Sequence, residues 1–276
     1  MNEHTAPNYA LFAIKYAHSP QRQADENFLT SQDVHDGPMP LDFFIWVAVA
    51  GERVVLIDSG ADEATCSRRG HTFLRNPADA LQYIGLAPED ITDLVVTHMH
   101  WDHMGNLERF PNAQILIHKQ EIEHATGCSM CHPMLRRPYD VEQVCDVIRA
   151  LYAGRVRFNK GDIEIAPGLT AHLIGGHTPG LQVVRVKTQR GNVVLASDAL
   201  HFYANALQQN PFPIIVDVAD YLDGITTLTQ LADSPQHIIS GHDPLVMTAF
   251  PAFSAESEGI VAQLDKPPLN PLPVIS

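Results

Sequence analysis

The feature that most constrains this chain is a cluster of three histidines and one aspartate in the segment THMHWDHMG. The cluster directly follows the apolar run Leu94–Val96, which predicts a short buried strand. Side chains two residues apart in an extended segment point the same way, so His98 and His100 can bind one cation together. Asp102 and His103 follow where the chain turns, and we expect them to face a second cation. Imidazole and carboxylate ligands without thiolate suit zinc, and also manganese, iron or cobalt.

Four further polar side chains stand where other predicted strands end. They are His177 after 169–174, Asp198 after 192–196, His242 after 238–239 and Asp58 after 54–57. Loops at the ends of strands on a rigid sheet are where functional side chains are held still. Each of these residues alone is more often incidental, but together with the histidine cluster they predict a single metal site.

Apolar periodicity and turn residues predict two successive β-rich halves, each followed by helices. The predicted strands are Tyr9–Tyr16, Leu41–Ala50, Val54–Ile57, Leu94–Val96, Ala113–Ile117, Ile163–Ile165, Leu169–Ile174, Gln182–Val186, Asn192–Ala196 and Ile238–Ile239. The predicted helices are Pro77–Ile84, a segment beginning at Gln120, Val141–Tyr152 and Tyr221–Leu231. This order indicates a β-sandwich core with outer helices in one α/β domain, residues 1–276.

The order HxHxDH, GHTPG, SDA and GHD resembles the metallo-β-lactamase superfamily. The length and the segments around these motifs are similar to its N-acyl-homoserine lactonase group, which includes pyridoxolactone-type hydrolases. The resemblance covers roughly residues 41–246 and implies the four-layer αβ/βα sandwich of that family. It also implies a ligand set: one metal held by His98, His100 and His177, a second by Asp102, His103 and His242, with Asp198 bridging both. Asp58 would then orient a ligand histidine through its other ring nitrogen.

The activity implied by the resemblance is opening of a lactone, an acyl-homoserine lactone or related cyclic ester, by a hydroxide that bridges two divalent ions, zinc being the first choice. Asp102 would move the proton. The lactonase group has a tyrosine shortly after the bridging aspartate. Here Tyr203 comes two residues later than in that pattern, and His201 takes the earlier place. Both are candidate donors to the developing oxyanion, and Tyr203 is the preferred one.

Other activities share part of this pattern. Thioester hydrolysis of the glyoxalase II type uses the same motif, but the Pro-rich tail after Leu264 lacks the basic helical region of those enzymes. Flavodiiron-type redox proteins carry glutamate where this chain has His100. Hydrolysis of another ester or of a cyclic amide stays open. So does a metal- or ligand-binding protein without turnover, which is a different class altogether.

The chain has 18 basic against 32 acidic residues and a formal net charge of -14, which disfavours nucleic acid and anionic membranes as partners. No run reaches the roughly 20 apolar residues that span a bilayer, and no signal-peptide pattern precedes the first strand. Four cysteines do not suggest a disulfide scaffold, and Cys128 and Cys131 form only half of a structural zinc site. We therefore expect a cytoplasmic protein with a small-molecule substrate, and a homodimer stays open.

Two segments are expected to wall the pocket. One is the long loop Ser19–Pro40, with His35 and Asp36, and the other is the insert 126–157. Phe202, Phe212 and the Met-bearing segment 128–134 would make the pocket partly apolar. The Pro-rich tail, residues 266–276, is expected to be an irregular cover or extension.

Overall fold

The computed structural model describes residues 6–30, 33, 35 and 37–275, and the strands in this part of the chain form two sheets. The first sheet has the order β13-β1-β2-β3-β5-β6-β7, with β4 paired to β1. Its strands are β1 (Ala10–Ser19), β2 (Leu41–Ala50), β3 (Arg53–Ile57), β4 (Thr72–Phe73), β5 (Asp93–Val96), β6 (Gln114–His118), β7 (Val156–Asn159) and β13 (Val261–Gln263). The half from β3 to β7 is parallel. Parallel strands require crossover connections, and helices supply them here.

The second sheet has the order β12-β11-β10-β9-β8. Its strands are β8 (Ile163–Ala166), β9 (Leu169–Leu173), β10 (Gln182–Thr188), β11 (Gly191–Leu195) and β12 (Ile238–Ile239). Neighbouring strands are antiparallel, except that β11 and β12 run parallel. Because β11 and β12 are parallel neighbours, the loops that follow them lie at the same edge of the sheet.

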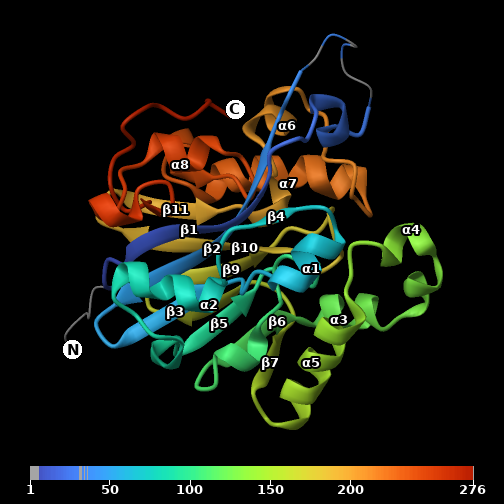
Figure 1. Ribbon diagram of the computed structural model, residues 1–276, viewed down its shortest axis with the longest axis horizontal. Helices are drawn as coiled ribbons and strands as arrows, with labels where there is room; N and C mark the ends of the chain where they lie inside the picture. The colour runs from blue at the N-terminus through green and yellow to red at the C-terminus, as the bar shows by residue number, and fades with distance from the viewer. Residues whose placement is uncertain (1–5, 31–32, 34, 36, 276) are drawn as a thin grey trace.

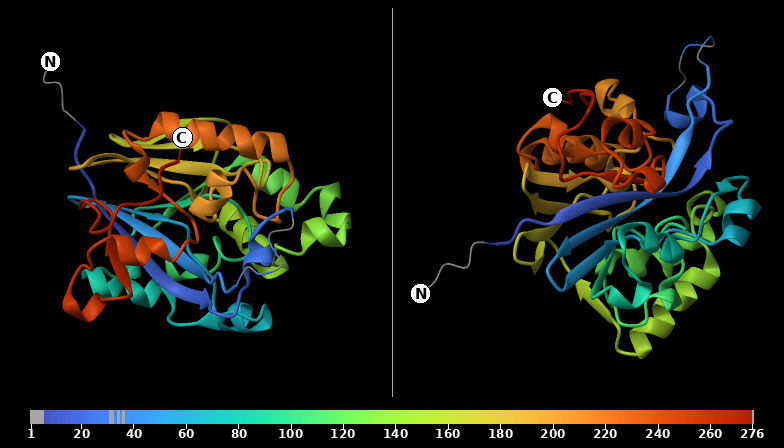
Figure 2. Two further views of the ribbon diagram at one scale, coloured as in Figure 1. Left: turned by 90° about the horizontal axis from the view of Figure 1, so that it is seen from above. Right: turned by 60° about the vertical axis from the view of Figure 1, so that its left-hand side comes forward.

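Helices cover the outer faces of both sheets. They are α1 (Glu63–Arg68), α2 (Pro77–Ala80), α3 (Lys119–Ala125), α4 (Pro133–Arg136), α5 (Val141–Tyr152), α6 (Tyr203–Leu207), α7 (Val218–Leu231) and α8 (Leu245–Ala249). Figure 1 shows α7 and α8 on one side of the strands and α2, α3 and α5 on the other. In the right-hand view of Figure 2 the long strand β1 runs between the blue-to-green part of the chain and the orange-to-red part. The four-layer αβ/βα sandwich predicted from the sequence is confirmed.

Strand β2 shows why the first sheet lies inside the molecule. Its successive side chains point to opposite faces, and both faces are buried. Phe44 and Trp46 belong to the apolar cluster that also holds Val184 of the second sheet. Ile45 and Val47 belong to the cluster that packs beneath the helices of the first half. The apolar run in β2 therefore joins the two halves of the core.

Several predicted boundaries hold and others do not. Strand β2 and helix α5 have the predicted bounds. The helix predicted over Pro77–Ile84 is wrong as a single element, because α2 ends at Ala80 and a 3-10 helix continues from Leu81 to Ile84. The segment Ser19–Pro40 is not wholly a loop, since β1 extends to Ser19 and Ala24–Asn27 forms a 3-10 helix. Both corrections concern short segments in which one turn of helix leaves no clear periodicity.

The Pro-rich tail has no regular secondary structure over residues 266–275, as predicted, and it packs back onto the protein. Leu272 and Ile275 are buried in the core cluster of the second sheet. The side chain of Gln236 donates to the Leu272 carbonyl at 2.8 Å and accepts from the Leu272 amide at 2.7 Å. Among the described helices, none has the length and apolar character that crossing a bilayer requires.

Candidate metal centre

The seven ligands suggested by the sequence lie together and are buried. Two groups made only of these ligands offer donor atoms within 4.8 Å of one another: His98, His100, His177 and Asp198 form the first, and Asp102, His103 and His242 form the second. A third group joins Asp198 and His242 with His201. Loops after four strands supply these side chains: β5 for the motif, β9 for His177, β11 for Asp198 and β12 for His242. Asp58 follows β3 and contacts His103. The side chains therefore converge because the strand ends converge.

The carboxylate of Asp198 lies between the two groups. Its Oδ2 is 3.1 Å from Nε2 of His177 and 3.6 Å from Nε2 of His98. Its Oδ1 is 3.0 Å from Nε2 of His242 and 3.2 Å from Nε2 of His103. Each oxygen thus faces a different group, which is the arrangement that a carboxylate shared by two cations needs.

Some of the donor atoms lack hydrogen-bond partners within the protein, which favours cations as their partners. Nε2 of His98 and of His103 is buried without a hydrogen-bond partner among the described residues. Burial, reinforced by the neighbouring imidazoles, holds the pKa of His98 and His100 well below the ordinary value, so their lone pairs are free near neutral pH. Burial opposes ionisation of Asp198, but four surrounding histidines, His201 first, hold its pKa well below the usual range. Asp198, more than the other nearby carboxylates, raises the pKa of His103 and His242 against the effect of burial. Imidazoles gathered around an ionised carboxylate are the donor types that bind divalent metals.

Asp58 makes the contact that its predicted orienting role requires. Its Oδ2 is 2.7 Å from Nδ1 of His103, so Nε2 of that ring points to Asp198. Thr97 donates to the same carboxylate through its backbone amide at 2.7 Å and its hydroxyl at 2.8 Å. Asp58 has a φ of 58°, a conformation that aspartate tolerates better than most residues. A similar contact holds His242, whose Nδ1 lies 2.8 Å from the carbonyl oxygen of Asp42.

Glu121, in helix α3, is a structural element of the centre that the sequence analysis missed. Its buried carboxylate accepts from the amide of Met99 at 2.7 Å and from the amide of Gly180 at 2.8 Å. It therefore ties the loop after β5 to the loop that carries His177. An isolated acidic residue in a short helix gives no sequence signal for this role.

Two glycines allow the loops to approach one another. A Cβ on Gly241 would lie 2.4 Å from the carbonyl oxygen of Ser197, the residue before Asp198. A Cβ on Gly176 would lie 2.5 Å from the backbone nitrogen of Tyr221 in α7, and the φ of Gly176 is +79°. The motifs SGHD and GGHTPG thus need glycine for close packing around the centre.

The structure corrects the preference for Tyr203 as an oxyanion donor. Tyr203 is the first residue of α6, and its buried hydroxyl donates to the carbonyl of Ile238 at 2.9 Å. His201 lines the pocket instead, with Nε2 3.0 Å from Oδ2 of Asp198 and its ring stacked at 3.8 Å on Phe212. Burial lowers the pKa of His201 to about 3, so the ring is neutral near neutral pH.

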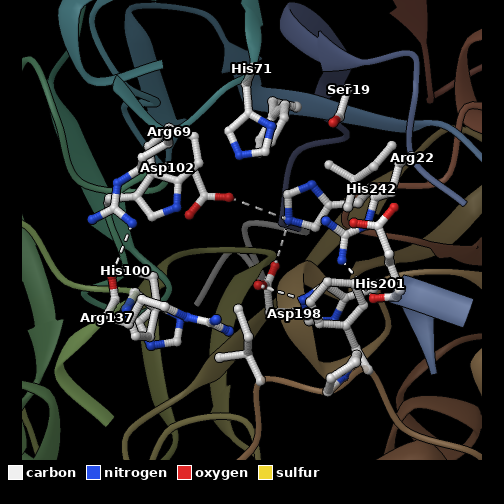
Figure 3. A pocket seen from close by; sticks show the side chains of 18 of the residues that line it. Ser19, Arg22, Arg69, His71, His100, Asp102, Arg137, Asp198, His201 and His242 are labelled. Carbon is white, nitrogen blue, oxygen red and sulfur yellow. Dashed lines mark hydrogen bonds and ion pairs between the residues drawn. The ribbon is translucent and has the colours of Figure 1, made fainter. Parts of the chain in front are cut away.

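A cavity of about 730 Å³ opens above the centre, with Asp102, Asp198 and His242 in its floor (Figure 3). Both segments predicted to wall it contribute: Ser19, Arg22 and Glu26 from 19–40, and Arg137 and Pro138 from 126–157. Phe212 lines the cavity as predicted.

Other residues expected in the pocket wall lie elsewhere. Phe202 does not line the cavity, because it is buried in the core. The side chain of His35 is 89% exposed and contacts Asp33 at 2.6 Å, and Asp36 lies outside the described residues. Cys128 and Cys131 are exposed free thiols and belong to none of the metal-type clusters in the described chain.

Comparison with known proteins agrees with the fold. The model of the metallo-beta-lactamase superfamily matches residues 42–242, and the chain belongs to this superfamily. Within it, the chain resembles the N-acyl homoserine lactonase group. It is 27% identical over 208 residues to an N-acyl homoserine lactonase of Bacillus thuringiensis, a match that covers 70% of this chain and 77% of the relative.

Solved structures show the same fold. A quorum-quenching N-acyl homoserine lactone lactonase matches with a TM-score of 0.68 at 24% identity, over 86% of this chain and 94% of that one. AidC, a dizinc quorum-quenching lactonase, matches with a TM-score of 0.68 at 20% identity, over 98% of this chain and 97% of that one.

Proposed function

We propose that this chain is a binuclear-metal-dependent hydrolase that opens a lactone ring, an acyl-homoserine lactone or a related cyclic ester. The observation that carries the proposal is the position of Asp198, whose two carboxylate oxygens face two separate groups of ligands. The lactonase relatives support the choice of a carboxylic ester as the bond that is cleaved. Zinc is the proposed metal, because the donor set holds only imidazole and carboxylate groups.

His98, His100 and His177 would hold one ion, Asp102, His103 and His242 the other, and Asp198 both. Two divalent ions in these positions would supply a water nucleophile that is reactive near neutral pH and would polarise the ester carbonyl. Although most of the ligands are buried, a substrate can approach them through the cavity above Asp102 and Asp198, which His100, His177 and His242 also line.

Ring opening needs a proton to reach the leaving alkoxide oxygen, and Asp102 is the proposed carrier. Its carboxylate lines the cavity, and its Oδ2 lies 3.6 Å from Nε2 of His103 and 3.7 Å from Nε2 of His242. The hydroxyl of Tyr16 donates to the backbone carbonyl of Asp102 at 2.8 Å and so fixes the loop. The neutral ring of His201 lines the cavity, and its Nε2, which lies 3.0 Å from Oδ2 of Asp198, is the proposed donor to charge on a carbonyl oxygen.

The test is a substrate panel for the zinc-loaded protein: acyl-homoserine lactones, other lactones, a cyclic amide, p-nitrophenyl esters and thioesters. Ring opening is measured as acid release at constant pH and as addition of one water to the product by mass spectrometry. We expect turnover of at least one lactone. Turnover of thioesters alone would replace the proposal with a glyoxalase II-type activity. Bound metal without turnover of any substrate would favour a binding protein.

A further inference from the structure

Three arginines from separate segments line the cavity above the metal centre. Arg22 follows β1, Arg69 follows α1 and Arg137 follows α4. Figure 3 shows Arg69 and Arg137 on one side of the pocket and Arg22 on the other, with Asp198 and His242 between them. The whole chain has only 18 basic residues against 32 acidic ones. Because the protein is acidic overall, three guanidinium groups at one cavity indicate a specific binding partner for their positive charge.

In the described chain, none of the three guanidinium groups lies within 4.0 Å of a carboxylate oxygen. Arg68, the neighbour of Arg69, shows the contrast, because its Nη2 pairs with Asp140 at 2.6 Å. Glu26 also lines the cavity and lies near enough to raise the pKa of Arg22, but its carboxylate accepts from the backbone amide of Gln23 at 2.8 Å. The positive charge at the cavity is thus only partly balanced.

Two of the guanidinium groups are held in place by the protein. Arg69 donates to the carbonyls of Arg137 at 2.9 Å and Tyr139 at 2.8 Å, and its Cζ lies 5.0 Å from the centre of a Trp101 ring. Arg22 donates to the Glu26 carbonyl at 2.7 Å, and its Cζ lies 5.0 Å from the Phe212 ring centre. Preorganised guanidinium groups lose little freedom when they bind an anion.

The Arg137 guanidinium differs, because no described residue forms a hydrogen bond or ion pair with it, and Arg137 is exposed at the cavity mouth. Arg69 donates a hydrogen bond to the backbone carbonyl of Arg137 and so fixes the backbone position from which the Arg137 side chain extends. Burial lowers the pKa of Arg22 and of Arg69. The charge of Glu26 raises the pKa of Arg22, the charges of Asp102 and Asp140 raise that of Arg69, and the nearby charge of Arg137 lowers both. The three like charges therefore interact, and an anion between them would relieve the repulsion.

We infer that the substrate carries a carboxylate at the end remote from the ester that is cleaved, and that Arg137 and Arg22 bind this carboxylate. Arg69 acts as a positioning residue, because it holds the segment that bears Arg137. This inference rests on the proposed lactone hydrolysis and names its substrate class: a lactone with an anionic acyl chain. Arginine is suited to this task because its fork of N–H donors matches the two oxygens of a carboxylate.

The kinetic test compares three acyl-homoserine lactones of equal chain length, whose chains end in a carboxylate, a carboxamide or a phosphonate. The zinc-loaded native protein should prefer the carboxylate over the carboxamide by about tenfold or more in kcat/KM, mostly through KM. Arg137→Gln and Arg22→Gln should each raise KM for the carboxylate about tenfold and leave the carboxamide within about twofold. Arg136→Gln, an exposed neighbour that does not line the cavity, is the matched control and should change neither.

Preference for the carboxamide, or equal losses on both substrates in the arginine variants, would overturn the inference. Preference for the phosphonate over the carboxylate would reassign the site to a phosphate-type group and overturn the carboxylate assignment. Circular dichroism and metal analysis of each variant show whether it keeps its fold and its metal. These measurements distinguish loss of substrate binding from loss of structure.

A binding experiment keeps the inference testable if none of the lactones is opened and the proposed function fails. Adipate and hexanoate are titrated calorimetrically into the zinc-loaded protein. Both can place one carboxylate at the centre, but only adipate has a second for the arginines. Adipate should bind about tenfold tighter than hexanoate, and Arg137→Gln should remove the difference. Equal affinity for the two acids in the native protein would overturn the inference.

Discussion

The Asp58 carboxylate lies 2.7 Å from Nδ1 of His103, and this contact sets the direction in which the metal-facing nitrogen of that ring points. Asp58→Asn should keep the size of the side chain and remove its charge. We expect metal affinity or turnover to fall about 10- to 100-fold, as for other partners of ligand histidines. Metal analysis and lactone hydrolysis measure the change. Asp79→Asn, on an exposed pair with Arg109, is the control and should behave like the native protein.

Asp198 is the residue whose replacement should be most severe. Asp198→Asn keeps the shape of the side chain but replaces one carboxylate oxygen with an NH2 group. The single remaining oxygen can then bind the metal ion of only one of the two ligand groups. We expect bound zinc to fall below two equivalents per chain and turnover to be lost. Metal analysis after dialysis and hydrolysis of the best lactone test this. Near-native turnover in the variant would contradict the bridging role.

His201 and Tyr203 can be separated by matched substitutions. His201→Phe removes the N–H at the cavity wall and should lower kcat by about 100-fold if His201 stabilises the oxyanion. His201→Gln restores an N–H donor and should recover part of the rate. Tyr203→Phe should leave kcat unchanged and cost about 1 kcal/mol of folding stability, because it removes the hydrogen bond that the hydroxyl donates to Ile238 and the weaker one that it accepts from the Ser240 amide. A larger loss of kcat in Tyr203→Phe than in His201→Phe would reverse the assignment.

Much of this centre was predictable because apolar strands and the polar residues after them leave clear sequence signals. His98, His177, Asp198 and His242 each follow a short buried strand, and the sheets bring those strand ends together. The direction in which a side chain points was harder to predict than the strand end at which it lies. The 3-10 turn Ser197–Ala199 and the start of α6 turn His201 to the cavity and Tyr203 into the core, which spacing alone does not reveal.

The elements and side chains that the sequence analysis missed share a cause. Helices α1 and α6 are only six and five residues long, too short for a helical period to show. The cavity arginines come from three segments with no common motif, and only their folded positions bring Arg22 near Arg69 and Arg137. Tertiary contacts of this kind leave no local pattern in the chain.

The pKa of Cys66 gives a test of the packing beside the centre. Burial first, then the charges of Asp102 and Asp62, raises the pKa of this thiol to about 12. The thiolate is disfavoured in the folded state, so the stability contributed by the neutral thiol is present below the ordinary cysteine pKa and is lost as pH rises toward 12. Iodoacetamide at pH 8 should label the exposed Cys128 and Cys131 and spare Cys66 until the chain unfolds. Peptide mass spectrometry checks this, and rapid labelling of Cys66 in the folded protein would contradict it.

Gly241 tests the close approach of the loops around Asp198. Gly241→Ala places a methyl group 2.4 Å from the Ser197 carbonyl oxygen, so the two loops must separate. We expect a loss of about 1–3 kcal/mol in folding stability and weaker zinc retention. Gly161→Ala is the control, since a Cβ there meets nothing within 4 Å. Denaturant unfolding and metal analysis compare the two variants, and equal behaviour would contradict the packing.

The central claim is that distant side chains form one centre for two divalent ions. A crystal structure of the protein grown with zinc, with anomalous data collected on both sides of the zinc absorption edge, tests it most directly. We predict two strong peaks, one among His98, His100 and His177 and one among Asp102, His103 and His242, with Asp198 contacting both. Absence of zinc from these residues, or a single ion that leaves His103 and His242 without a ligand bond, would contradict the account.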